Sequence, residues 1–148
     1  MKLVITIALS ALAMPGAVLA QACPPDYPTM AAMLHESSLS RTEYRDGVTS
    51  TYYLPGPRLR FLGFQPTQIQ VADLYGPLTV SISLPGNSII PYEAAYKAIY
   101  PNYSSHAESG LMFQIPRKGN KLSEAILQSM SYQTSATLLC YYGSGKTK

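Results

Sequence analysis

A strict alternation of apolar and polar side chains over residues 78–84 constrains this chain more than any other feature. The stretch reads Leu78-Thr79-Val80-Ser81-Ile82-Ser83-Leu84. Successive Cβ atoms of a strand point to opposite faces, so this pattern predicts a strand with one buried and one solvated face. Residues 67–74 alternate similarly around Ile69 and Val71, and Tyr75-Gly76-Pro77 supplies turn residues between them. A β-hairpin is therefore the predicted centre of the fold.

Other stretches add strands and helices around this hairpin. Strand composition is found at residues 48–54, 58–64 (broken at Gly63), 111–115 and 134–142. Apolar residues at helical spacing predict helices over residues 26–37, 88–100 and 120–130, the last through Leu122, Ala125, Ile126 and Met130. Residues 38–47 and 102–110 are predicted as polar connections. This order indicates an α+β fold: a short antiparallel sheet of five to six strands covered by two to three helices.

The first twenty residues have the features of a secretory signal peptide. Lys2 is followed by an apolar run over residues 3–13, a break at Pro15-Gly16, and small residues before Ala20. The apolar run is too short for a membrane anchor. The sequence therefore predicts a signal peptide over residues 1–20, one domain over 21–142 and a flexible basic tail over 143–148. A periplasmic or secreted location follows, without membrane insertion after cleavage.

The two cysteines lie at opposite ends of the predicted domain. Cys23 and Cys140 form an even pair in an exported chain, which predicts a disulfide joining the two ends. One alternative is a metal or catalytic thiol, although neither cysteine has a second cysteine or a histidine at ligand spacing. A further alternative is lipidation of Cys23. A bacterial lipobox has a large aliphatic residue three positions earlier, where this chain has Ala20.

Composition and motifs give no sign of catalysis. Charged residues make up 13% of the chain and the net charge is +3, without a basic stripe typical of nucleic-acid binding. The two histidines, His35 and His106, lack the neighbours of a metal site, and no G-x-S-x-G motif is present. We therefore predict a protein that is not an enzyme and has no cofactor or metal.

Tyrosine is the one residue type that suggests recognition. The chain has twelve tyrosines and no tryptophan. Each buried hydroxyl needs a partner, so most tyrosines are expected at the boundary with water, either as structural residues or in a binding surface. The predicted binding surface is the loop after Pro101 with a basic rim at the next turn, and its residues are Tyr100, Tyr103, His106, Glu108, Arg117 and Lys118.

A short segment resembles a known family of inhibitors. Ser109-Gly110, Phe113 and Lys118-Gly119 are similar to the serine–glycine motif of periplasmic C-type lysozyme inhibitors, which also bridge their two ends by a disulfide. The resemblance covers about ten residues, and the aromatic residue is Phe rather than Tyr. It implies an essentially all-β fold, whereas helical periodicity is predicted here, so no function is carried over from it.

Three hypotheses about function follow. The first is a small exported binding protein, such as an inhibitor or immunity-type protein that masks another protein. The second is a component of an envelope assembly that docks by an edge strand, and the third is a small hydrolase with an unrecognised site. The expected partner is another protein, and the sequence does not predict the oligomeric state.

Overall fold

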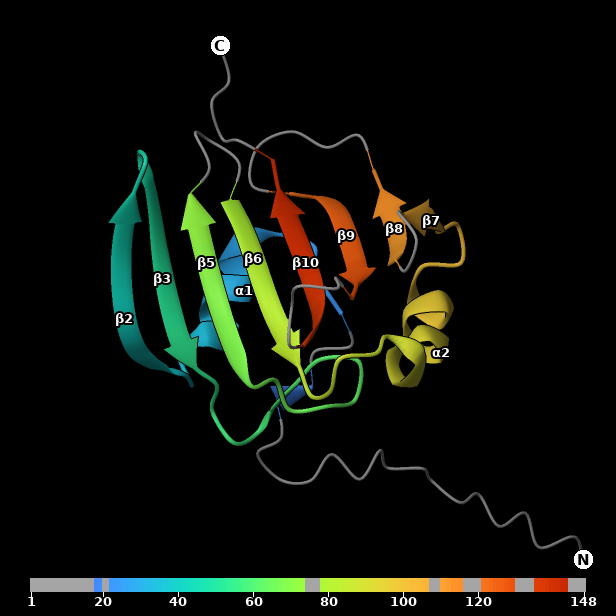
Figure 1. The fold of residues 1–148 in the computed structure, drawn as a ribbon, viewed down its shortest axis with the longest axis horizontal. Coiled ribbons are helices and arrows are strands. Elements are labelled where there is room, and N and C mark those ends of the chain that lie inside the picture. Colours follow the sequence, from blue (N-terminus) through green and yellow to red (C-terminus); the bar gives the residue numbers. More distant parts are fainter. Residues whose placement is uncertain are drawn as a thin grey trace, which may run out of the picture.

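One antiparallel sheet dominates the fold of the described residues (Figure 1). The computed structural model describes residues 18–19, 22–73, 78–106, 110–115, 121–129 and 135–143. Within them, eight strands are ordered β2-β3-β5-β6-β10-β9-β8-β7, and β1 pairs with β4 separately. The elements are β1 (Val18–Leu19), α1 (Tyr27–Leu34), β2 (Ser38–Arg45), β3 (Val48–Leu54), β4 (Leu59–Arg60), β5 (Gln68–Asp73), β6 (Leu78–Leu84), α2 (Ile90–Ile99), β7 (Ser104–His106), β8 (Gly110–Gln114), β9 (Leu122–Gln128) and β10 (Ala136–Tyr142).

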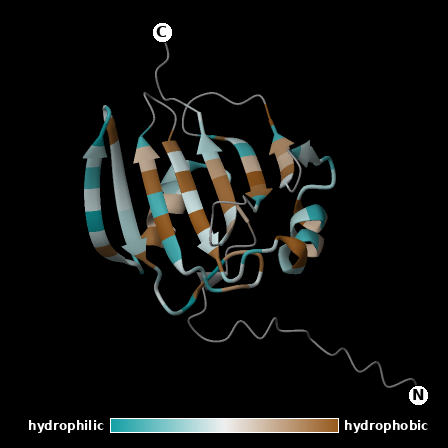
Figure 2. Cartoon of the chain, in the orientation of Figure 1, coloured by the Kyte–Doolittle hydropathy of each residue, from teal (hydrophilic) through white to brown (hydrophobic). Residues whose placement is uncertain are grey.

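The predicted pairing of β5 with β6 is confirmed. The strands are antiparallel with Ile69 opposite Ile82 and Val71 opposite Val80, so their apolar residues share one face. Hydrophobic and polar bands alternate along both strands in Figure 2. Ile69, Val80 and Ile82 have no solvent exposure, whereas Ser81 on the other face is half-buried. The predicted turn at 75–77 lies outside the described residues.

Both helices cover the apolar face of the sheet. Asp26 caps α1 by accepting a hydrogen bond from the Thr29 N–H at 2.8 Å, and Met30 and Leu34 of this helix are buried. On α2 the buried residues are Tyr92 and Tyr96. The described helices are both too short to cross a membrane as an apolar span.

Four tyrosines are buried in this core, while the other six described tyrosines are partly or fully exposed, as expected for most of them. Tyr92, Tyr96, Tyr100 and Tyr142 are each at most 5% exposed. Three of them donate their hydroxyl to a backbone carbonyl: Tyr92 to Pro85, Tyr96 to Ala125 and Tyr142 to Pro24. Such bonds satisfy the polar atom while the ring contributes apolar area. The Tyr100 ring stacks on Phe113 at 4.5 Å, and its hydroxyl faces the backbone of Cys23 without a well-aligned hydrogen bond.

The predicted disulfide between Cys23 and Cys140 is present. The two Cα atoms lie 5.6 Å apart, and the residues are separated by 117 positions. Cys140 lies on the buried face of β10, opposite Val80 of β6. The bond therefore ties the segment before α1 to the centre of the sheet, and a loop of this size corresponds to about 5 kcal/mol in the chain-entropy model. Because the Cys23 sulfur is used in this bond, it is not available for lipidation.

The predicted α+β class, with five to six strands and two to three helices, is wrong. The protein is mainly an eight-stranded antiparallel sheet with two short helices. Residues 120–130 contain the strand β9 in place of the third helix. Ala125, Ile126 and Leu127 are consecutive and all buried, as expected of a strand covered on both faces. Their helix-like spacing could not be distinguished from such a strand by periodicity alone.

Two predicted connections also contain strands. The polar segment 38–47 contains β2, and the polar loop 102–110 contains β7. Both strands form the edges of the sheet, where apolar alternation is not required.

The predicted strand 58–64 is reduced to the two residues of β4. Leu62 and Gly63 form a tight turn with positive φ angles of 51° and 87°, and Phe61 and Phe64 exchange backbone hydrogen bonds across it. The predicted break at Gly63 is therefore a turn.

The predicted signal peptide and tail lie almost wholly outside the described residues. Of residues 1–20, the structure describes only Val18 and Leu19, which pair in parallel with Leu59 and Arg60. Of the predicted tail it describes Gly143.

Candidate binding edge of the sheet

Strand β2 forms a long, open edge of the sheet (Figure 1). All eight of its residues are exposed, and β3 is its one neighbour among the described strands. The other edge strand, β7, has three residues. In Figure 2, most of β2 is coloured as hydrophilic or neutral. A strand that pairs on one side presents N–H and C=O groups that another strand can bind.

The turn between β2 and β3 determines which backbone groups face this open edge. Arg45 and Val48 are paired, and the two residues between them, Asp46 and Gly47, have φ angles of 53° and 80°. A two-residue turn with positive φ at both positions is flanked by a hydrogen-bonded pair. Counting back from Arg45 in twos, the residues that bond to β3 are 45, 43 and 41. The N–H and C=O groups of Thr42 and Tyr44 therefore point outward.

Charged and aromatic side chains form a cluster on the outer face of this edge. The Arg41 Nε donates to Glu43 Oε1 at 2.8 Å, and its guanidinium lies 3.8 Å from the centre of the Tyr52 ring. The hydrogen bond to Glu43 raises the pKa of Arg41. The Tyr52 hydroxyl completes the cluster by donating to Glu43 at 3.4 Å. The two charges are therefore held side by side on β2.

The inner side of β2 is more apolar and is only partly covered by α1. Leu39 and Tyr44 are 64% and 76% exposed. The pairing with β3 shifts between Leu39 and Arg41, which places a bulge at Ser40. Charges and bulges on an edge strand reduce unselective pairing, so a strand that adds to β2 must match this pattern.

A cleft of about 310 Å³ lies beside the start of this edge. It separates α1 from the adjoining ends of β2 and β3, and it is lined by Tyr27, Ala31, Leu34, His35, Ser37, Leu39 and Tyr53. Burial raises the pKa of the Tyr27 hydroxyl, with a smaller effect from Tyr53. The mixture of apolar side chains with one histidine and one serine fits a single large side chain of a bound segment.

Gly56 helps to fix the wall of this cleft. A Cβ atom at Gly56 would collide with the Glu36 carbonyl, so the chain after β3 approaches the end of α1 closely. The Gly56 N–H donates to Ser37 Oγ at 3.3 Å, and Arg58 binds the Glu36 carboxylate with contacts of 2.7 and 2.8 Å. These contacts hold the residues that follow α1 in place.

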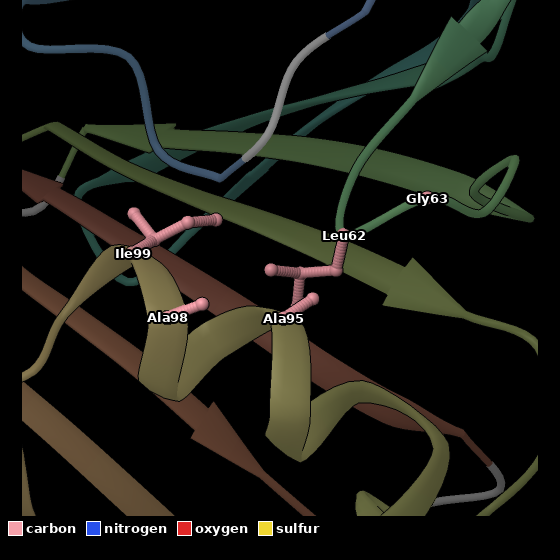
Figure 3. A pocket seen from close by; sticks show the side chains of 5 residues that line it. All are labelled: Leu62, Gly63, Ala95, Ala98 and Ile99. Carbon is pink, nitrogen blue, oxygen red and sulfur yellow. The ribbon is translucent and has the colours of Figure 1, made fainter.

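A second hollow lies beside α2. Figure 3 shows Leu62 next to the small side chains of α2, and the groove of about 630 Å³ is lined by Leu62, Gly63, Ala95, Ala98 and Ile99. No titratable side chain lines this groove among the described residues. Its surface is suited to an apolar contact.

The structure places the predicted binding residues in different environments. Tyr100 is buried in the core. Tyr103 is 37% exposed, with Lys97 Nζ 5.3 Å from its ring centre, and His106 is the last residue of β7. Glu108, Arg117 and Lys118 lie outside the described residues, as do Ser109, Lys118 and Gly119 of the segment that resembles the lysozyme inhibitors. A binding role for the loop stays a prediction.

One feature of the sequence does point to the β2 edge. Asp46-Gly47, within the segment predicted as a polar connection, is a strong hairpin signal. A hairpin turn requires a second strand before it, so residues 38–45 could have been assigned as that strand. The described part of the chain contains no group of three or more His, Cys, Asp or Glu side chains that could hold a metal ion.

Comparison with known proteins adds no functional information. No protein-family model, curated protein or solved structure matches this chain, and its function is therefore inferred from the geometry of the fold.

Proposed function

We propose that this protein is a small exported binding protein that captures an extended segment of another protein by strand addition to β2. The observation that carries the proposal is the open edge, where eight exposed residues present the outward backbone groups of Thr42 and Tyr44. In strand addition the backbone hydrogen bonds supply affinity, and pockets for alternate side chains supply specificity. The cleft beside Leu39 is such a pocket.

Export is supported by the predicted signal peptide over residues 1–20. The disulfide between Cys23 and Cys140 is compatible with an oxidising compartment. A periplasmic or secreted location remains part of the proposal. In that setting, strand addition could serve to mask a target, as an inhibitor or immunity-type protein does, or to join an envelope assembly.

The test compares how strongly Thr42→Pro and Thr42→Val each capture exported proteins from an envelope extract. Proline removes the outward N–H of residue 42, which is not needed for pairing with β3, and prolines are tolerated on edge strands. Valine removes the hydroxyl but keeps the N–H. The affinity for proteins that bind through β2 should fall at least about tenfold in Thr42→Pro and stay unchanged in Thr42→Val.

Circular dichroism and thermal melting serve as controls, and both variants should match the wild type. If Thr42→Pro is folded and captures the same proteins as strongly as the wild type, the edge is not the binding site.

A further inference from the structure

The charge pattern of β2 is complementary to itself when two copies run antiparallel. Arg41 and Glu43 flank Thr42 and project from the same face of the strand, opposite Tyr52 and Ser50 of β3. A two-fold axis through Thr42 would place Arg41 of each copy opposite Glu43 of the other. Each strand already contains its own Arg41–Glu43 ion pair at 2.8 Å. The four charges would therefore alternate in sign both along each strand and across the axis.

The backbone is suited to the same arrangement. Thr42 has its N–H and C=O directed outward, so two copies of Thr42 would exchange both hydrogen bonds across the axis. Tyr44 is the next outward residue, and its opposite residue would be Ser40. On the inner side of the sheet the two Thr42 side chains would be neighbours, and threonine pairs are favourable across antiparallel strands.

Three other alignments of two copies are disfavoured by charge. Centring the axis on Arg41 sets two arginines opposite each other, and centring it on Glu43 sets two glutamates opposite each other. Parallel pairing in register also places like charges together, which destabilises a pair of strands. Centring it on Tyr44 also sets Glu43 opposite Arg45, but only residues 43–45 of each copy would then face strand residues of the other, compared with residues 39–45 for an axis on Thr42. Charge and the length of the paired strands together therefore favour the antiparallel alignment on Thr42.

We propose that the β2 edge binds a second copy of this chain, antiparallel and centred on Thr42, so that two sheets join into one. This inference rests on the proposed role of β2 as an edge for strand addition and gives that edge a second partner, a copy of the same chain. The exposed Leu39 and Tyr44 side chains would lose solvent contact near the two ends of the paired strands. One strand from each copy makes a small interface, so the dimer should be concentration-dependent.

The test is a charge-swap cycle measured by sedimentation equilibrium over a wide range of protein concentrations. Arg41→Glu and Glu43→Arg each place like charges opposite each other in the dimer, and each should weaken dimerisation by at least about tenfold. The double variant restores opposite charges and should recover most of the wild-type association. Thermal melting of all four proteins checks that the fold is unchanged.

The outcomes distinguish this inference from the proposed function. A wild-type protein that stays monomeric while capturing another protein through Thr42 would overturn the dimer and leave the function standing. A dimer that survives both single substitutions, or Thr42→Pro, would show that the copies meet elsewhere. A monomeric protein with no Thr42-dependent partner would overturn both.

Discussion

Single buried tyrosines show how a small core can contain polar atoms. The hydroxyl of Tyr142 donates to the Pro24 carbonyl at 3.0 Å, and the side chain has no solvent exposure. Burial, with smaller effects from Tyr100, Asp26 and Tyr27, raises the pKa of Tyr142 above its ordinary value of 10.0. Burial likewise raises the pKa of Tyr100 to about 12. The folded protein therefore keeps these phenolic protons at a pH where the unfolded chain loses them.

The consequence is a loss of stability at alkaline pH. Below pH 10.0 both states hold the Tyr142 proton and the full stability is present. As pH rises above this value the unfolded chain alone releases the proton, so unfolding becomes more favourable by up to about 1.4 kcal/mol per pH unit for each such tyrosine. Tyr142→Phe should lose about 1 kcal/mol at neutral pH and then decline less steeply than the wild type.

Chemical denaturation at a series of pH values measures this difference. Tyr44→Phe is the control at pH 7, where it should leave the free energy of unfolding unchanged because Tyr44 is 76% exposed. Parallel alkaline profiles for the wild type and Tyr142→Phe would contradict the assigned burial of this hydroxyl.

Among the elements, strand β6 has the most strongly determined orientation. Val80 has no solvent exposure and lies between Val71 and Cys140, whereas Ser81 lies on the other face between Gln70 and Leu139. Val80→Asp would bury a carboxylate without a partner and should cost more than about 4 kcal/mol. Ser81→Asp should change stability by less than about 1 kcal/mol.

Urea denaturation of the two variants tests the register of the sheet. Because a shift by one residue exchanges the faces of a strand, equal stabilities for Val80→Asp and Ser81→Asp would mean that the orientation is wrong.

Sequence prediction succeeded for elements whose pattern matches their environment. Strand β6 alternates because one of its faces is buried, and Pro101 ends the segment of α2 because a proline restricts the residue before it. It failed for β9, where Ala125, Ile126 and Leu127 alternate between the two faces of the strand and are all buried, so that no apolar alternation is present. It failed for β2 because an edge strand needs no apolar alternation.

For the whole molecule, the sheet order could not be derived from local patterns. β10 lies between β6 and β9, although α2 and the three strands β7, β8 and β9 separate it from β6 along the chain. The disulfide was predictable because two cysteines allow one pairing. The candidate binding edge was not predictable from the sequence. Strand β2 is at the edge because β3 pairs with β5 on the side away from β2, and this order is a property of the whole sheet.

Residue-resolved amide exchange in β2 tests strand addition most directly. In the free protein, the N–H groups of Arg41 and Glu43 bond to β3 and should exchange slowly, while those of Thr42 and Tyr44 should exchange fast. When a second copy or another partner adds as a strand, the Thr42 and Tyr44 groups should become protected and the other two should change little. If Thr42 and Tyr44 still exchange fast when a partner is bound, or if no partner ever protects them, β2 is not the binding strand.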